Sequence, residues 1–368
     1  MKSVDVGLGE HSYSIYVKAG LLENIAFYLE QYSLTENIFI ITDDNVYGLY
    51  YNYLQEKLSY FGRKIVTIKV PAGEQSKSLN TANYLYTKLL ELNATRHSAI
   101  IAFGGGVVGD LAGFIASTFM RGIKFAQIPT TILSQVDSSV GGKVGINHEL
   151  GKNLIGSFYQ PVFVLIDPLV LRTLPIREIN AGLAEVLKYS FINDNSFFEL
   201  LHNKLSDIST LNNMQLLEQI LTTCCSIKAK IVEQDEKESG LRATLNFGHT
   251  IGHALEAATN YHTFLHGEAV SHGMRGAVHL SLLENYINSS QAQSMLSLID
   301  RLDPPPVPED LSIDDIYNAM QRDKKRSREG QMWILLKNIG KVFMTRDVSE
   351  ENVKKAIRCV LANCNKIN

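Results

Sequence analysis

The sequence predicts an open, Rossmann-like α/β domain over residues 1–174, followed by a mainly α-helical domain over residues 175–368. Three observations predict this fold class. At roughly 150 residues per domain, 368 residues are enough for two domains. Short runs rich in β-branched residues alternate with helix-like stretches in the first half. In the second half, apolar residues instead recur at spacings of three and four, the period of one helix face.

The strands of the first half are predicted from apolar runs that lack a clean alternation with polar residues. Such runs are typical of strands buried on both faces of a parallel sheet. Helix-like stretches such as Ser78–Leu92 and Val108–Ser117 lie between them. Open sheets of this kind bind ligands beyond the carboxyl ends of their strands, so the residues after each run are binding-site candidates. The runs are Ile38–Thr42, Ile65–Val70, Ser98–Phe103, Phe125–Ile128 and Val162–Ile166.

The helices of the second half are predicted from their apolar spacing. Leu183, Val186 and Leu187 form one such group, and Ile227 and Ile231 belong to another. A cluster of prolines must interrupt this pattern, because proline lacks an amide donor and fixes φ, so we expect a loop there. These prolines are Pro304, Pro305, Pro306 and Pro308.

The composition excludes several classes of function. The net charge of −3 is too balanced for non-specific capture of nucleic acid or of an anionic membrane. An anionic ligand must therefore meet a local cluster of cations. No run of about 18 apolar residues occurs, and Asp5 stands where a signal peptide needs apolar residues, so we expect neither export nor an anchor. The four cysteines include no C-x-x-C pair, which favours a reducing cytoplasm.

A glycine-rich turn, Gly104–Asp110 (GGGVVGD), follows the strand that ends at Phe103. Glycines let the chain approach a pyrophosphate closely, and the amides at the start of the next helix are donors for it. We therefore expect a dinucleotide here. The spacing differs from G-x-G-x-x-G, and a tight turn without a ligand is the alternative interpretation. Asp43, Glu74 and Lys77 follow two other strands and are candidates for binding ribose hydroxyls.

A second group of residues combines cations with glycine and serine. Arg121, Lys143, Lys152 and Asn153 offer both the forked and the point-like donors that a phosphorylated ligand needs. Surface lysines are usually solvated, which is the alternative for each residue alone. Their density in one glycine-rich segment instead favours a phosphate-binding loop.

A third group has the residue types of a metal site. His249 and His253 are four residues apart, so on a helix they lie only about 40° apart and are able to chelate zinc. His266 and Glu185 would come from other segments. A catalytic zinc takes three protein ligands and keeps one position open. Two sets therefore compete: Glu185 with His249 and His266, or a set that includes His253. For each of the ten histidines, an ordinary polar role is the alternative.

Several short segments occur in a fixed order along nearly the whole chain. They are Gly104–Arg121, Pro129–Asp137, Lys143–Asn153, Ala181–Lys188 (AGLAEVLK), Gly240–Arg242 with Asn246 and His249, His266–Glu268, and Asp323–Lys325. Together they resemble the 3-dehydroquinate synthase family. Their number and order make this match far more specific than any single motif.

The resemblance implies a zinc-dependent lyase, with cobalt as an alternative metal, that keeps NAD as a catalytic cofactor. Such an enzyme converts 3-deoxy-D-arabino-heptulosonate 7-phosphate into 3-dehydroquinate and phosphate, in the shikimate pathway. The implied steps are oxidation by NAD, elimination of phosphate, re-reduction, ring opening and aldol cyclisation. The resemblance also implies a cytoplasmic homodimer with a small sugar phosphate as its ligand, and neither a nucleic-acid nor a membrane partner.

The resemblance further implies roles for individual residues. The implied zinc ligands are Glu185, His249 and His266. The implied catalytic residues are Lys152, His253, Lys188 and Asp137. The implied substrate ligands are Arg121 (reaching across the dimer interface), Lys143, Asn153, Lys228, Arg242, Asn246 and Lys324 or its neighbour Lys325. The implied NAD ligands are Asp43, Glu74, Lys77, Gly105, Gly106, Val107, Asp110, Thr130, Thr131, Asp137, Lys143, Lys152, Thr173 and Leu174.

Three other classes of protein share parts of this pattern. A zinc-dependent polyol dehydrogenase of the glycerol dehydrogenase type shares the two domains and NAD, but has no use for the phosphate-binding cations. A related sugar phosphate cyclase that makes a different carbocycle would differ in carboxylate recognition, for which Lys228 and Arg242 are the expected residues. A non-enzymatic NAD-binding or zinc-binding protein is the third, and the number of matched positions argues against it.

Overall fold

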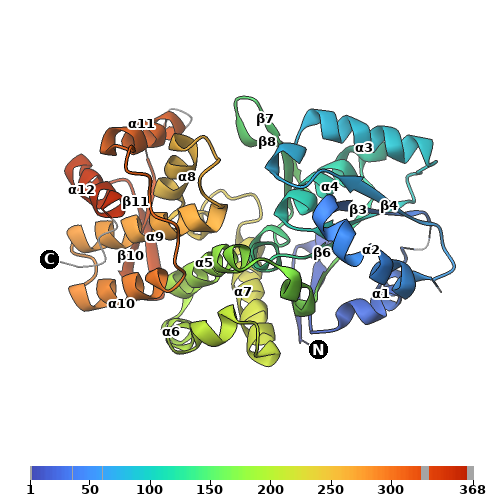
Figure 1. Ribbon diagram of the computed structural model, residues 1–368, viewed down its shortest axis with the longest axis horizontal. Coiled ribbons are helices and arrows are strands. Elements are labelled where there is room, and N and C mark those ends of the chain that lie inside the picture. Colours follow the sequence, from blue (N-terminus) through green and yellow to red (C-terminus); the bar gives the residue numbers. More distant parts are fainter. Residues whose placement is uncertain (1, 35, 60, 325–330, 363–368) are drawn as a thin grey trace. The chain divides into compact units, whose positions relative to one another are not determined.

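The computed structural model of the chain forms two compact units (Figure 1). It describes residues 2–34, 36–59, 61–324 and 331–362. The first unit contains residues 1–174 and 213–237, and the second contains residues 175–212 and 238–368. Residues 213–237 thus belong to the first unit rather than to the expected helical domain, because helix α7 (Met214–Gln234) packs against the sheet of the first unit. The spacing of apolar residues predicts that a segment is a helix with one buried face, but it does not predict which part of the protein that face packs against.

Within the described residues, the first unit is built on a seven-stranded sheet with the order β1-β2-β9-β6-β5-β3-β4. β1 pairs antiparallel with β2, and the other strand pairs of this sheet are parallel. The five predicted runs form strands, whereas β1 and β2 were not predicted. The strands are β1 (Lys2–Val6), β2 (Tyr13–Val17), β3 (Ile38–Asp43), β4 (Ile65–Val70), β5 (Ala99–Gly104), β6 (Lys124–Pro129) and β9 (Phe163–Ile166).

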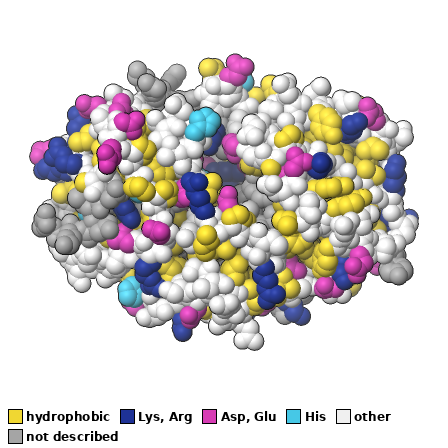
Figure 2. All heavy atoms as spheres, in the orientation of Figure 1, with side chains coloured by type: hydrophobic (Ala, Val, Ile, Leu, Met, Phe, Trp, Pro, Cys, Tyr) yellow, Lys and Arg dark blue, Asp and Glu magenta, His cyan; other side chains and the backbone are white. Residues whose placement is uncertain are grey.

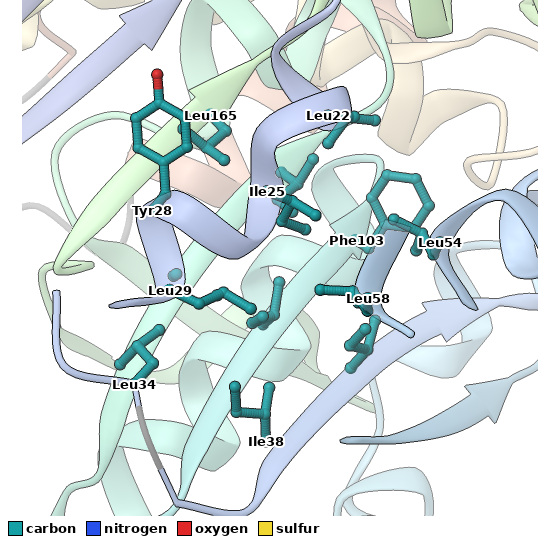
Figure 3. Close-up of a cluster of buried hydrophobic side chains, with 14 of the residues drawn as sticks. Leu22, Ile25, Tyr28, Leu29, Leu34, Ile38, Leu54, Leu58, Phe103 and Leu165 are labelled. Carbon is teal, nitrogen blue, oxygen red and sulfur yellow. The ribbon is translucent and has the colours of Figure 1, made fainter. Parts of the chain in front are cut away.

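Both faces of the central strands β3, β5 and β9 are buried, which explains why their sequences do not alternate. On β3, Ile38 and Ile40 belong to a core cluster on one face, whereas Phe39 and Ile41 belong to a second cluster on the other. Figure 3 shows part of the first cluster, in which Leu54 lies beside Phe103. α1 and α2 contribute to the first cluster, and α3 and α4 to the second. The helices are α1 (Ile25–Gln31), α2 (Asp44–Leu58), α3 (Leu79–Glu91) and α4 (Gly106–Thr118).

The strand order reverses between β3 and β5. β4 lies on one side of β3, and the next strand in the chain, β5, lies on the other. At such a switch point, the helices that follow the two strands leave on opposite faces and open a crevice for ligands. Asp43 ends β3 and Gly104 ends β5. The nucleotide-binding candidates therefore lie where open α/β sheets bind their ligands.

A two-stranded antiparallel hairpin follows β6 in the first unit, formed by β7 (Lys143–His148) and β8 (Gly151–Phe158). The expectation of a glycine-rich loop in this segment is wrong. Gly145 pairs with Gly156, and a Cβ on Gly156 would come within 2.3 Å of the Val144 carbonyl oxygen. These glycines permit a close approach of two strands, which a composition-based prediction cannot distinguish from a loop.

The second unit is mainly helical, as predicted, with one small hairpin. α9 contacts α5, α8, α10 and α12 and is buried along most of its length. α9 and its neighbours share an apolar cluster that includes Leu280, Trp333 and Ile357. The prolines from Pro304 to Pro308 lie in a loop, as expected. The elements are α5 (Ile176–Asn193), α6 (Asn195–Ser209), α8 (His249–Ala258), α9 (His266–Leu283), α10 (Ser289–Asp300), α11 (Ile313–Lys324), β10 (Trp333–Asn338), β11 (Lys341–Thr345) and α12 (Glu350–Leu361).

Basic and acidic side chains are interspersed over the face shown in Figure 2, in keeping with the net charge of −3. In the part of the chain that the structure describes, none of the helices is long and apolar enough to cross a membrane.

Candidate active site

Three imidazoles and one carboxylate of the second unit lie close together. The ligand nitrogens of His249, His253 and His266 are all within 4.8 Å of one another. Glu185 reaches the same place, since its Oε1 lies 3.7 Å from Nε2 of both His249 and His266. The structure therefore brings together all four residues of the two competing ligand sets.

These side chains come from three helices of the second unit (Figure 1). Glu185 is fully buried on α5, whereas His249 and His266 are the first residues of α8 and α9. Groups that project from packed helices are held more firmly than groups on loops. The cluster is thus positioned by the helical core of this unit.

Glycines allow these helices to touch through their backbones. A Cβ on Gly267, the residue after His266, would come within 1.8 Å of the Ala181 carbonyl oxygen on α5. A Cβ on Gly273 would come within 1.9 Å of the Gly248 carbonyl oxygen, just before α8. The spacing of the cluster therefore depends on the absence of side chains at two positions of α9.

The donor set fits a divalent metal ion. Glu185 Oε1 is buried and accepts no hydrogen bond from the described residues, while the ammonium of Lys188 pairs with the other oxygen, Oε2. A buried carboxylate oxygen without a donor is costly unless a positive charge meets it. Donors bound at ~2.1 Å in a tetrahedron lie ~3.4 Å apart, close to the 3.7 Å that separates Oε1 from each Nε2. Carboxylate oxygen and imidazole nitrogen are ligands that zinc accepts.

His249 has the protonation state that a metal ligand needs. Burial lowers its pKa well below the usual range, and the charge of Lys188 lowers it further, so the ring stays neutral. Its Nδ1 lies 3.2 Å from the Phe247 carbonyl oxygen. A neutral ring that donates from Nδ1 presents the lone pair of Nε2, which is the nitrogen that faces Glu185.

His266 has a different environment. Its Nδ1 lies 3.5 Å from Oε2 of Glu256, a buried residue of α8. Burial lowers the pKa of His266, but the hydrogen bond and charge of Glu256, together with the charge of Glu185, outweigh burial and raise the pKa above its usual value. The two ring nitrogens of His266 are thus divided between two carboxylates.

The glycine turn of the first unit leaves the start of α4 open. Gly105 precedes this helix, and no side chain caps its first turn. A Cβ on Gly104 would come within 2.6 Å of the Val108 side chain, so glycine is needed for this close packing. A helix start that is reached through glycines and lacks a side-chain cap can bind an anion. This part of the structure fits the pyrophosphate of a dinucleotide.

The other predicted NAD ligands also lie around the carboxyl ends of the strands, and several of them have structural partners. Asp43 Oδ1 accepts from the Asn45 and Val46 amides, each at 2.9 Å, and so caps α2. Thr131 hydrogen-bonds to the Ser134 hydroxyl. The remaining residues of this group are Thr130, buried after β6, and Thr173 and Leu174, which end the first of the two segments that form this unit.

Lys77 is the centre of a polar network in the first unit. Its ammonium lies 2.7 Å from Asp110 and 3.6 Å from Glu74, and it also donates to the side chain of Asn153. Burial lowers the pKa of Lys77, but the two carboxylates outweigh burial and raise it, so the side chain stays charged. Burial raises the pKa of Asp110, and the charge of Lys77 opposes this shift. The network joins predicted NAD ligands to a predicted phosphate ligand.

The predicted phosphate ligands are carried by the β7–β8 hairpin and by a strained turn. Lys143 and Asn153 are exposed on the hairpin, and Lys152 is half-buried there. Arg121 is exposed at a φ of 68°, directly after Met120 at 50°. Such left-handed conformations are uncommon for residues other than glycine and often occur at functional sites.

The two predicted carboxylate ligands fall in different units. Lys228 belongs to α7 of the first unit, where its ammonium lies 2.6 Å from Asp137 Oδ1. Arg242 is almost fully buried in the second unit. Asn246 follows it and donates to Glu238 at 3.1 Å. Lys324 ends α11, but its side chain and the whole of Lys325 lie outside the described residues.

Two groups around the metal cluster were missed by the sequence-based prediction. Glu256 follows His249 by seven residues, a spacing of two helical turns that would have placed it on the same face. Arg177 binds Glu268 through two hydrogen bonds of 2.6 and 2.8 Å, which ties the start of α5 to the start of α9. No local signal predicts this pair, because its members are 91 residues apart in the chain.

Comparison with known proteins gives consistent matches. Family models described as 3-dehydroquinate synthase N-terminal and C-terminal match residues 67–181 and 182–326. A 3-dehydroquinate synthase of Desulforamulus reducens is 46% identical over 354 residues, which cover 96% of this chain and 98% of that protein.

Solved structures with the same fold include two other synthases. The 2-epi-5-epi-valiolone synthase of Streptomyces hygroscopicus, solved with NAD+ and Zn2+ bound, has a TM-score of 0.89 and 26% identity. A 2-deoxy-scyllo-inosose synthase complexed with carbaglucose-6-phosphate, NAD+ and Co2+ has a TM-score of 0.88 and 27% identity. Each match covers 97% of this chain and 99% of the solved chain.

Proposed function

Because the chain belongs to the 3-dehydroquinate synthase family, we propose that it converts 3-deoxy-D-arabino-heptulosonate 7-phosphate into 3-dehydroquinate and phosphate. The enzyme is a lyase of the shikimate pathway, which leads to chorismate and the aromatic amino acids. One observation carries this proposal. The identity is 46% to a 3-dehydroquinate synthase along almost the whole chain, against 26% and 27% to synthases named for other products.

The cofactors of the proposal are NAD and zinc, with cobalt as an alternative metal. Two solved relatives carry NAD+ with Zn2+ or Co2+. The buried, donor-free oxygen of Glu185 and the facing Nε2 atoms of His249 and His266 support these three residues as the metal ligands. His253, exposed beside them, is then left to contact the substrate. When bound, the metal supplies a Lewis acid and NAD supplies a hydride acceptor.

The NAD ligands of the proposal all belong to the first unit. The open start of α4 supports the pyrophosphate position, and the Lys77 network supports the positions beside it. Lys152 would stand near the nicotinamide. The full set is Asp43, Glu74, Lys77, Gly105, Gly106, Val107, Asp110, Thr130, Thr131, Asp137, Lys143, Lys152, Thr173 and Leu174.

The chain's own residues supply binding, orientation and charge for the reaction. Lys143, Asn153 and Arg121 would hold the substrate phosphate, and cations around a leaving phosphate stabilise the negative charge that develops on elimination. Lys228 and Arg242 would hold the carboxylate. The ion pair of Lys228 with Asp137 keeps both groups in place to orient the substrate. Holding the chain of the opened sugar in a reactive conformation promotes the final aldol cyclisation.

Further substrate contacts are proposed in the second unit. Lys188, buried and paired with Glu185, would orient the substrate hydroxyls next to the metal. Asn246 would contact the ring, and Lys324 would add a cation to the phosphate site. These assignments follow the family motifs at these positions of the chain.

The chain would act as a homodimer. β8 is an edge of a two-stranded sheet, and its exposed apolar side chains include Leu154 and Phe158, with Leu150 in the adjoining turn. An exposed apolar edge strand is a surface that pairs readily with another chain. Arg121 would then reach the phosphate site of the partner. Sedimentation equilibrium of the purified protein should give twice the mass of one chain. The mass of a single chain would contradict the proposed homodimer.

We place the enzyme in the cytoplasm. Its proposed substrate and NAD are intracellular metabolites. Cys224 and Cys225 are adjacent and buried in α7, a poor arrangement for a disulfide scaffold.

The function is tested by incubating the purified protein with the heptulosonate phosphate, zinc and a trace of NAD. The expected products are phosphate and 3-dehydroquinate in equal amounts, without net accumulation of NADH. A polyol dehydrogenase would instead form NADH and release no phosphate. Absence of both products from protein loaded with zinc and NAD would contradict the proposed function.

A further inference from the structure

We propose that Glu256 is a positioning residue of the metal centre, whose carboxylate orients the imidazole of His266 so that Nε2 points toward Glu185. This inference rests on the metal centre of the proposed function and goes beyond it, since Glu256 belongs to none of the family motifs described above.

The placement of Glu256 supports this role. It lies on α8 two turns after His249, so one helix face carries both a proposed ligand and an acidic group. Its side chain is only 6% exposed, and Oε2 lies 3.5 Å from His266 Nδ1. The other ring nitrogen of His266 lies 3.7 Å from Glu185 Oε1. The imidazole is thus held between two carboxylates from different helices.

His249 is held by the same arrangement with a different acceptor. Its Nδ1 faces the Phe247 carbonyl oxygen, and its Nε2 faces Glu185. Histidines that bind metals commonly donate their second N–H to a carbonyl or a carboxylate, which fixes the ring and strengthens the ligand. The structure therefore shows this pattern at both proposed histidine ligands.

His266 depends on such a partner more than His249 does. The His266 side chain is 32% exposed, compared with 11% for His249. The loop that leads to it contains Asn260 and Tyr261 in left-handed conformations, at φ of 52° and 60°. Packing therefore restrains the His266 ring less than the His249 ring. The buried carboxylate of Glu256 would provide the additional contact that fixes the orientation of the His266 ring.

The test uses two substitutions of different severity. Glu256→Gln keeps the size and an acceptor oxygen but removes the charge, whereas Glu256→Leu removes the acceptor. Zinc affinity is measured by competition with a chromophoric chelator, and ligand geometry by the visible absorption of the cobalt-loaded protein. We expect zinc affinity to fall about 10-fold in the glutamine variant and about 100-fold in the leucine variant, with an altered cobalt spectrum in the latter.

Asp300→Asn is the matched control. Asp300 is a partly buried carboxylate of α10 that pairs with Arg275 of α9 at 2.7 Å, so its loss also removes an ion pair from this unit. Zinc affinity and the cobalt spectrum of this control should match those of the wild type. If Glu256→Leu fails to fold, the zinc affinity of Glu256→Gln, compared with that of Asp300→Asn and the wild type, still tests the role of Glu256.

The outcomes separate this inference from the proposed function. If the wild type binds zinc and both Glu256 variants bind it equally well, the inference is overturned while the metal centre stands. An equal loss in Asp300→Asn would mean a general weakening of the unit, and would also overturn the inference. If the wild type itself binds neither zinc nor cobalt, the metal centre of the proposed function fails, and the role of Glu256 fails with it.

Discussion

Replacing Gly267 with alanine tests whether backbone contact between helices sets the geometry of the metal site. The added Cβ would lie 1.8 Å from the Ala181 carbonyl oxygen and 2.5 Å from its carbonyl carbon. Ordinary contact begins at 3.4 Å, so the two helices must separate by the difference, about 1.6 Å. Both obstructing atoms belong to the backbone, and no side-chain rotation relieves the clash.

The energetic cost should lie at the upper end of the range for overpacked cores, about 3 kcal/mol. The movement also acts on the metal site, because Ala181 lies one turn before Glu185 on α5 and Gly267 directly follows His266. A change of more than an ångström in the 3.7 Å between Glu185 Oε1 and His266 Nε2 would prevent both from binding one ion. We expect zinc affinity to fall by at least about 10-fold.

Urea unfolding of the metal-free protein measures the first effect, and chelator competition measures the second. Gly48→Ala is the control, because Gly48 lies within α2 and its Cβ would meet no atom within 4 Å. That variant should keep its zinc affinity and gain about 0.5–1 kcal/mol of stability from the better helix propensity of alanine. A Gly267→Ala variant with wild-type stability and zinc affinity would refute the reasoning.

The remaining predictions concern other parts of the chain. His249→Ala should lose zinc affinity by more than about 100-fold, together with activity, and an active variant with stoichiometric zinc would mean that another histidine is the ligand. Lys143→Ala should weaken binding of the phosphorylated substrate more than binding of NAD, and titrations that show the reverse order would contradict its assignment. His272 is buried and its Nε2 lies 2.8 Å from the Pro305 carbonyl oxygen. Burial lowers its pKa from 6.5 to about 4, so the unfolded chain takes up a proton below pH 6.5 that the folded chain does not. Stability should fall by ~3 kcal/mol between pH 6.5 and 4, and His272→Gln should remove this part of the acid sensitivity in urea unfolding at a series of pH values.

The fold could be predicted from the sequence where one physical cause dominates. Burial on both faces makes the central strands continuously apolar, as in β3, and this signal survives without any tertiary information. β1 has a different pattern, with exposed and buried residues alternating from Val4 to Val6, which is typical of a strand at a partly solvated edge. The pattern was present but short, so it did not stand out in the sequence.

The candidate site could be predicted only in part. Residue types and local spacing indicated His249 and His253, because they share one helix. The meeting of His266 with Glu185 depends on how α5 and α9 pack, and the glycine contact at Gly267 that permits this packing has no periodicity to reveal it. The motif resemblance, and not the spacing, selected Glu185, His249 and His266 as the proposed ligand set.

The proposed metal ligands and the proposed NAD ligands belong to different units, so a variant can lose affinity for one cofactor and keep affinity for the other. The proposed metal ligands Glu185, His249 and His266, and Glu256 beside them, all belong to the second unit, so the proposed metal centre lies within one folded body. The proposed NAD ligands all belong to the first. A change that separates α5 from α9, such as Gly267→Ala, should therefore weaken zinc binding while leaving NAD affinity intact. Activity needs both cofactors, so an activity assay alone cannot distinguish such a variant from one damaged in the nucleotide site. Separate titrations of zinc and NAD can do so, because each measures one unit by itself.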